Sequence, residues 1–161
     1  MANLIDRVRR NHGLEHATIT IMLSKQGPMR VIGRAVPDGF YVYANVETDR
    51  LREYSTEALS RLQGGEAHLA VTPLCGTNLV VAGVLAGVGS YFAATSGRRG
   101  LDRLAISTLA ALVGVIAAQP LCRLAQKYAT TSPDVGDMRI VEVRRMSGRN
   151  VHKVRTAAVA Q

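Results

Sequence analysis

The sequence has few of the residues that stabilise small secreted domains or fill large soluble cores. It contains two cysteines, two phenylalanines and no tryptophan among 161 residues. Cys75 and Cys122 lie far apart in different contexts, so the disulfide framework typical of small secreted domains is not indicated. The length suits one ordinary domain, and the scarcity of large aromatic side chains limits the apolar surface that could cover long buried helices.

Charge is absent from two long apolar runs. Residues 79–95 and 104–122 contain no Asp, Glu, Lys or Arg, and each run approaches the roughly 20 residues needed to cross a hydrocarbon core. A short polar segment separates them, so we predict a transmembrane helical hairpin rather than two buried helices of a soluble domain. Within the first run, Gly83-x-x-x-Gly87, extended by Gly89 and Ser90, offers a small-residue face on which two helices can approach closely.

The chain has no predicted cleavable signal before this hairpin. Residues 1–24 carry charges throughout and contain no uninterrupted apolar core of the required length. We therefore expect the N-terminal segment to stay in the cytoplasm. Because a hairpin returns the chain to the side it left, both termini are then expected to be cytoplasmic.

Basic residues exceed acidic ones, with 20 Lys and Arg against 12 Asp and Glu and a formal net charge of +8. Such a surface attracts polyanions. The cationic C-terminal segment around Arg144, Arg145 and Arg149 has no interleaved aromatics or recognisable nucleic-acid motif. Anionic lipid headgroups are therefore the favoured partner and nucleic acid is disfavoured. His152 lies among these cations and is expected to face solvent.

The N-terminal segment reads as a helix with polar residues in its apolar stripe. At 100° per residue, one side of positions 4–23 carries mostly apolar residues together with three ionisable ones. That stripe comprises Leu4, Ile5, Val8, His12, Glu15, His16, Ile19, Met22 and Leu23. A solvated run of charges is not expected on a face that points to the core.

The remaining segments predict a sheet and a second helix. Residues 29–35 and 39–46 flank the turn signal Pro37-Asp38-Gly39, which favours a β-hairpin, and 47–65 has helical spacing. A short strand is expected at 67–72, and a strand pair at 138–146 and 150–159 around Ser147-Gly148-Arg149. We predict an α+β fold, a small mixed helix and sheet domain with an inserted two-helix transmembrane hairpin. It is organised as an α+β segment at 1–78, the hairpin at 79–122, and a linker with strands at 123–161 that join the first sheet.

His12, Glu15 and His16 have the composition of a zinc site. Residues four apart on a helix point the same way, so both imidazoles can bind one ion, and Glu15 can accept a proton from metal-bound water. The H-x-x-E-H order is that of inverzincin peptidases. The alternative is a buried structural network in which the three side chains bond to one another and to the protein.

A catalytic zinc site needs a third protein ligand, and several residues are open to that role. Cys75 and Glu66 are the leading choices for completing the site. The other candidates are His68, Glu53 and Glu57. An ordinary buried thiol is the alternative for Cys75, and solvated charges are the favoured interpretation of Glu53 and Glu57.

The segments NHGLEHATI, GRAVPDGFYVYANV and GGEAHLAVTPLCGTN, followed by the apolar hairpin, resemble the DUF6391-type family of uncharacterised bacterial membrane proteins. The similarity covers roughly residues 5–125. Gly13 replaces an Ala of the family motif, and Thr72 stands where that motif has a His, which leaves Cys75 as the remaining ligand candidate there. The resemblance implies this fold and a membrane location, and it implies no activity.

Together these features predict a multi-pass protein of the bacterial cell membrane with a cytoplasmic zinc site. The expected activity is that of a small membrane-associated zinc-dependent peptidase, with Glu15 as its catalytic base. The alternative is a non-enzymatic membrane scaffold or accessory subunit, in which the His and Glu cluster is structural. Its hairpin would then pack against a membrane-protein partner or another copy of the chain.

Overall fold

The computed structural model describes residues 3–97, 99–147 and 150–159, and it divides into two compact units. One unit combines residues 1–72 with 126–161, and we call it the α+β unit. The other comprises residues 73–125, and we call it the hairpin unit. The turn predicted at 147–149 lies largely outside the described residues, because Gly148 and Arg149 are not described.

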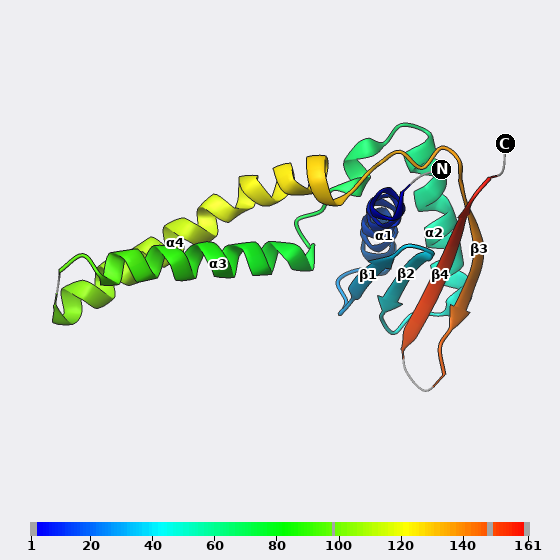
Figure 1. Cartoon of the computed structure of the whole chain (residues 1–161). Helices are drawn as coiled ribbons and strands as arrows, with labels where there is room; N and C mark the ends of the chain where they lie inside the picture. Colours follow the sequence, from blue (N-terminus) through cyan, green and yellow to red (C-terminus); the bar gives the residue numbers. More distant parts are fainter. Residues whose placement is uncertain (1–2, 98, 148–149, 160–161) are drawn as a thin grey trace. The chain divides into compact units, whose positions relative to one another are not determined.

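The α+β unit is built from two helices and one antiparallel sheet (Figure 1). In chain order its elements are α1 (Leu4–Gln26), β1 (Ile32–Val36), β2 (Gly39–Tyr43), α2 (Thr48–Gln63), the short 3₁₀ helix η1 (Ala67–Ala70), the π-helical turn η2 (Gln126–Thr130), β3 (Met138–Arg145) and β4 (Val151–Ala158). The strand order is β1-β2-β4-β3. Pairing of β2 with β4 joins the segments on either side of the hairpin unit in one sheet.

The strand predicted at 67–72 is wrong. Residues Ala67–Ala70 form a 3₁₀ helix instead, in which the Leu69 N–H donates to the Glu66 carbonyl over 3.1 Å. This turn directs Leu69 and Ala70 into the core while leaving His68 exposed. Local hydrogen bonds satisfy the backbone there, so the segment needs no place in the sheet.

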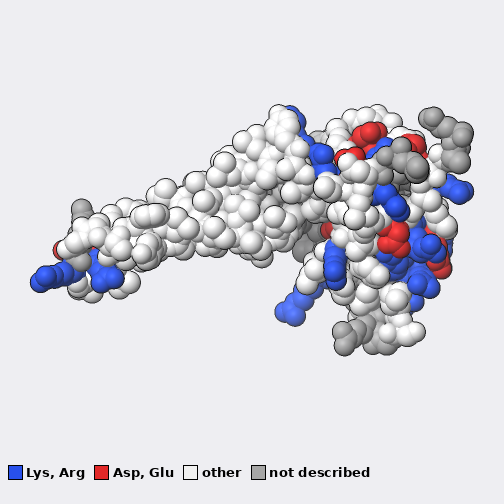
Figure 2. Space-filling view, in the orientation of Figure 1, with Lys and Arg blue, Asp and Glu red and all other residues white. Residues whose placement is uncertain are grey.

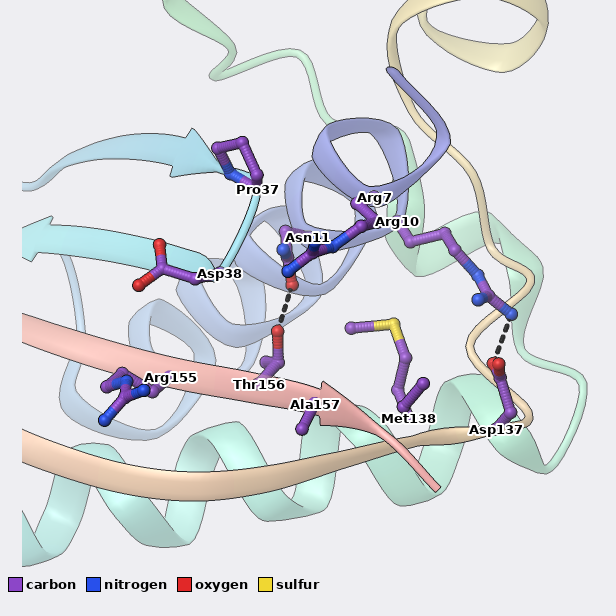
Figure 3. Close-up of a pocket in the computed structure, with 11 residues that line it drawn as sticks. Arg7, Arg10, Asn11, Pro37, Asp38, Asp137, Met138, Arg155, Thr156 and Ala157 are labelled. Carbon is purple, nitrogen blue, oxygen red and sulfur yellow. Dashed lines mark hydrogen bonds and ion pairs between the residues drawn. The ribbon is translucent and has the colours of Figure 1, made fainter. Parts of the chain in front are cut away.

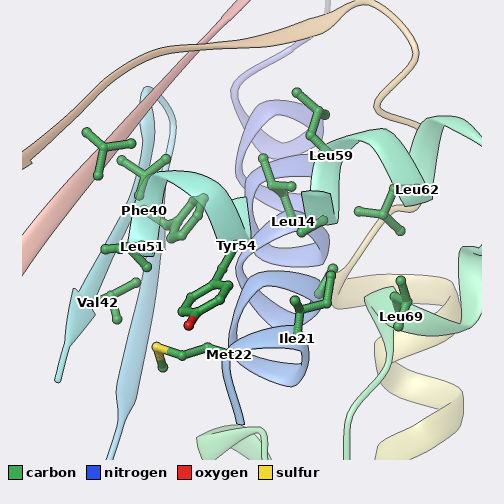
Figure 4. Packing of buried hydrophobic residues seen from close by; sticks show 14 of the residues in the cluster. Leu14, Ile21, Met22, Phe40, Val42, Leu51, Tyr54, Leu59, Leu62 and Leu69 are labelled. Carbon is green, nitrogen blue, oxygen red and sulfur yellow. The ribbon is translucent and has the colours of Figure 1, made fainter. Parts of the chain in front are cut away.

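The core lies between the helices and one face of the sheet. Phe40 and Val42 on β2 and Val154 on β4 have no exposed surface, and they point toward α1 and α2. Figure 4 shows Leu14 and Met22 of α1 and Leu51 and Tyr54 of α2 packed around Phe40 and Val42. Strand residues alternate between faces, so the opposite face of the sheet carries none of this packing.

Helix α1 is buried around its middle rather than along one stripe. The Asn3 side chain caps its start by accepting from the Asp6 N–H over 2.8 Å. The predicted stripe places Leu4 and Ile5 in the core, but they are 63% and 69% exposed. Leu14, which lies outside that stripe, is fully buried. The reason is that α1 is a central helix, packed on α2, the sheet, η1 and η2, so burial follows its neighbours rather than one side.

The hairpin unit consists of α3 (Gly76–Ala94) and α4 (Gly100–Ala125), which pack against each other. A Cβ built on Gly114 would lie 2.7 Å from the Leu85 carbonyl oxygen, and the Ser90 hydroxyl donates to the Ser107 carbonyl over 2.9 Å. The predicted small-residue face is confirmed at its extension, where a Cβ built on Gly89 would lie 3.1 Å from the Ala110 carbonyl oxygen, and it is wrong for Gly83 and Gly87 in this helix pair. Both glycines have open space beside them within the described residues.

Two helices of the chain, at Gly76–Ala94 and Gly100–Thr130, are long and apolar enough to cross a membrane. Their apolar side chains are largely exposed, as Leu79 at 79% and Phe92 at 68% show. Figure 2 shows no Lys, Arg, Asp or Glu along the middle of the hairpin unit. Among the described residues, no soluble core covers these surfaces.

Candidate metal centre

His12 and His16 lie one helical turn apart in the middle of α1, and their rings contact each other. The ring centroids are 4.3 Å apart, with an edge-to-face angle of 62°. His16 is buried, and His12 is half-buried. The four-residue spacing that predicts convergent imidazoles is therefore confirmed in its geometry.

Each imidazole is oriented by a backbone carbonyl of a different segment. His16 Nδ1 lies 2.9 Å from the Ala70 oxygen in η1, and His12 Nδ1 lies 3.0 Å from the Thr130 oxygen in η2. A carbonyl oxygen only accepts, so both Nδ1 atoms must carry the proton in these bonds. In the neutral rings, the lone pair is then on Nε2, which is the arrangement of histidines that bind metals through Nε2.

His16 Nε2 is a buried acceptor without a hydrogen-bond partner among the described residues. Leaving such an atom unsatisfied costs about 1–3 kcal/mol. Buried polar atoms are nearly always paired, so an exception calls for an explanation. A metal ion or an ordered water at Nε2 would provide the missing partner.

The Glu15 side chain packs against Gly33 of β1, on the helix-facing side of the sheet. A Cβ built on Gly33 would lie 1.8 Å from Glu15 Oε1, so only glycine leaves room for this carboxylate. Glu15 is 5% exposed. Gly33 is a residue that the sequence-based reasoning missed, although a glycine inside a predicted strand is a known sign of close approach by another group.

Most of the predicted third ligands are engaged elsewhere. The Glu66 carboxylate accepts two hydrogen bonds from Arg61, at 2.8 and 2.6 Å, and the Arg61 guanidinium lowers the pKa of Glu66. Glu53 pairs with Arg50, and Glu57 pairs with Lys25. These carboxylates have cationic partners that a metal ion would have to displace.

Cys75 is a buried cysteine at the N-cap of α3 in the hairpin unit. His12 and His16 of the α+β unit carry imidazole nitrogens, and Cys75 of the hairpin unit carries a thiol. Thiolate and imidazole are the ligands that zinc prefers. The identity of the metal is not determined by this set alone, because other transition metals also accept nitrogen and sulfur ligands.

The prediction that His152 faces solvent is wrong. His152 is 1% exposed, and neither ring nitrogen has a hydrogen-bond partner in the described part of the chain. It shares the helix-facing side of the central strand β4 with Val154, and its neighbours in sequence gave no sign of this. Burial lowers the pKa of His152, and the nearby positive charge of Arg145 lowers it further.

A hollow of about 530 Å³ lies beside the first half of α1, the β1–β2 turn and the ends of β3 and β4 (Figure 3). Asn11 forms its wall and is fully engaged. Its amide donates to the Val36 carbonyl over 2.9 Å, and its oxygen accepts from the Thr156 hydroxyl over 2.6 Å. Arg10 pairs with Asp137. These interactions tie α1 to the sheet, so the polar lining stabilises the fold.

The fold and the site define an α+β protein with a paired-histidine helix, and comparisons identify its family. The chain belongs to the DUF6391 family, a domain of unknown function, whose model matches residues 7–143. This confirms the predicted resemblance as far as the DUF6391 family itself. The chain is also 33% identical, over 136 residues, to an uncharacterised protein of the cyanobacterium Picosynechococcus sp.. The match covers 78% of this chain and 66% of that relative. No solved structure matches.

Proposed function

We propose that this protein is a membrane-anchored zinc protein in which His12 and His16 bind the ion through Nε2. The observation that carries the proposal is the buried, unpartnered Nε2 atom of His16, whose ring is fixed by the Ala70 carbonyl. Outer hydrogen bonds of this kind set the tautomer and orientation of metal-binding histidines. A second imidazole in ring contact supplies the adjacent ligand.

Cys75 is proposed as the third ligand. It lies five residues after Ala70, whose carbonyl contacts His16, and at about 3.3–3.6 Å per residue the chain limits their separation to roughly 18 Å. Cys75 carries the ligand type that zinc binds most strongly. Glu66 is the weaker choice, because Arg61 holds both of its oxygens.

The activity proposed for this centre is peptide hydrolysis at the membrane surface. A bound Zn²⁺ would supply Lewis-acid chemistry and lower the pKa of a bound water. Glu15, adjacent to His16 in the inverzincin order, is the residue proposed to accept the proton at its carboxylate. The Glu15 carboxylate lies against Gly33, and the residue is buried.

Membrane anchoring is supported by the two long apolar helices, whose exposed surfaces suit hydrocarbon rather than water. Insertion would place these apolar surfaces in hydrocarbon, and the helical hydrogen bonds would satisfy the backbone groups of the helix interiors there. The second candidate function is a scaffold or accessory subunit. The hydrogen bonds that His12 and His16 donate to backbone carbonyls favour this second function, because they would stabilise α1 without any metal.

The two functions are separated by elemental analysis of the full chain purified in a non-ionic detergent. We expect about one zinc per chain, as for a single three-ligand site, in the native protein and in the control His68→Ala, which removes an exposed histidine. The double variant His12→Ala/His16→Ala should lose the metal. Equal, sub-stoichiometric zinc in native and double-variant protein would overturn the proposal.

Two further variants test the individual roles. With cobalt in place of zinc, Cys75→Ser should lose the sulfur-to-metal charge-transfer band, and an unchanged band would remove Cys75 from the site. Glu15→Gln should keep the metal and lose hydrolysis of a fluorogenic peptide library. Hydrolysis at the native rate in Glu15→Gln would exclude Glu15 as the base.

A further inference from the structure

The sheet of the α+β unit has an outer face that neither α1 nor α2 covers. Phe40, Val42 and Val154 point to the helices, so their strand neighbours point the other way. The cross-strand register extends this alternation to all four strands. We call the resulting surface the outer face. It comprises Ile32, Arg34, Tyr41, Tyr43, Arg139, Glu142, Arg144, Val151, Lys153 and Arg155.

Positive charge dominates the outer face. Lys153 is neutralised by Asp38, at 2.8 Å, and Arg155 lies 3.6 Å from Glu142. The remaining cations are Arg34, Arg139 and Arg144, and within the described residues none of these three has a carboxylate at ion-pair distance. The face is complementary to an anionic partner.

Apolar and amphipathic side chains accompany these arginines. Ile32 on β1 is 68% exposed and lies opposite Tyr43 on β2, which is 39% exposed. An aliphatic side chain beside a tyrosine suits the boundary between headgroups and hydrocarbon, where an apolar body and a polar tip are both satisfied. Arginine adds an apolar stem and a charged head to the same boundary.

We propose that the outer face docks on anionic lipid headgroups. The proposal rests on the membrane anchoring proposed above, because a hairpin in the bilayer would hold the face near lipid at high effective concentration. Single-stranded nucleic acid fits less well. Binding to it uses successive aromatic platforms, whereas the Tyr41 ring is occupied by Lys153, whose Nζ lies 4.3 Å from the ring centroid. Tyr43 remains as the one exposed aromatic on the described outer face.

The experiment measures binding of the full chain to separate vesicles. The protein is first reconstituted into phosphatidylcholine nanodiscs, and binding is then followed by co-sedimentation with vesicles of phosphatidylcholine alone or with about 30 mol% phosphatidylglycerol, on the order of a natural anionic leaflet. The test variant is Arg34→Gln/Arg144→Gln. The matched control is Arg7→Gln/Arg50→Gln, which removes two exposed helix arginines outside the outer face. Circular dichroism confirms that each variant is folded.

We expect binding to the anionic vesicles only. At about 1 kcal/mol, or fivefold, per arginine, the test variant should bind about 25-fold more weakly, and the control should bind like the native protein. Equal losses in the two variants would overturn the proposal, because only net charge would then matter. Absence of binding to anionic vesicles would also overturn it.

Two controls address a nucleic-acid ligand and a failure of the membrane anchoring. Binding of a fluorescein-labelled oligouridine tests for a nucleic-acid ligand. If the native protein binds it tightly and Tyr43→Ala does not, the ligand of the outer face is RNA and the lipid proposal is overturned. Failure of the membrane anchoring is seen earlier, because the protein would then not co-elute with nanodiscs. If the protein enters nanodiscs but does not bind anionic vesicles, the headgroup proposal is contradicted and the proposed membrane anchoring is not affected.

Discussion

The contact between Glu15 and Gly33 gives the sharpest test of the site's architecture. In Gly33→Ala, the new Cβ would lie 1.8 Å from Glu15 Oε1 and 2.3 Å from its Cδ. Real Cβ contacts are essentially never shorter than 3.0 Å, so the carboxylate must retreat by at least 1.2 Å, the difference between 3.0 and 1.8 Å. A flexible exposed side chain would turn away into solvent, but Glu15 is buried.

The expected free energies have opposite signs in two backgrounds. Overpacking a buried site costs about 1–3 kcal/mol, while alanine in place of glycine in a strand gains roughly 0.5–1 kcal/mol by restricting the unfolded chain. Gly33→Ala should therefore destabilise the native protein by about 0.5–2 kcal/mol. In a Glu15→Ala background the clash disappears, and the same change should be neutral or stabilising.

The assay is urea unfolding of the full chain in non-ionic detergent, followed by tyrosine fluorescence. Four of the five tyrosines, Tyr41, Tyr43, Tyr54 and Tyr128, lie in the α+β unit, so the signal reports on that unit. The four proteins of the double-mutant cycle give the coupling energy directly. A coupling energy near zero, with equal effects of Gly33→Ala in both backgrounds, would refute the placement of Glu15.

Two other consequences are open to measurement. His152 has a lowered pKa when folded, so the unfolded chain binds its proton more readily and stability from this group is lost as pH falls below the ordinary value of 6.5. In His152→Leu, the free energy of unfolding should fall less steeply between about pH 7.5 and 5.5, because this titrating group is gone. The variant should also be more stable by about 1 kcal/mol, because it lacks the unsatisfied buried nitrogens. An unchanged dependence of the free energy of unfolding on pH, measured by urea unfolding, would contradict this prediction. In the hairpin unit, Gly114→Val should lower the melting temperature in detergent because its side chain would meet the Leu85 carbonyl, whereas Gly83→Val has open space; equal shifts would exclude tight packing at Gly114.

The periodic parts of the fold could be predicted from the sequence. Runs rich in β-branched and aromatic residues around Pro37-Asp38-Gly39 predict β1 and β2, because such side chains suit strands. Helical spacing over 47–65 predicts α2, because its apolar residues line the buried side of the helix. The buried residues of α1 do not follow the predicted stripe, because α1 packs against neighbours on several sides. A one-sided periodic pattern cannot predict the burial of such a helix. The 3₁₀ helix at Ala67–Ala70 depends on local backbone bonds rather than on side-chain pattern.

The pairing of the two histidines could be predicted from the sequence, and the groups that surround them could not. The spacing of His12 and His16 determines the ring contact, since four residues make about one helical turn. The carbonyls that orient the rings, at Ala70 and Thr130, come from distant segments and have no side-chain signature at all. The burial of His152 depends on the central position of β4, which only the strand order reveals.

The strand order also has a consequence for biosynthesis. Strand β2 is central in the finished sheet, yet 107 residues, 44–150, separate its last residue Tyr43 from Val151, the first residue of its partner β4. At about 5–20 residues per second, a ribosome needs roughly 5–20 s to supply that partner. During this interval the hydrogen-bonding edge of β2 is unpaired and open to aggregation. Synthesis of both apolar helices falls within the same interval, so maturation of the sheet has to wait for the hairpin, and a stalled hairpin would leave an aggregation-prone half-domain.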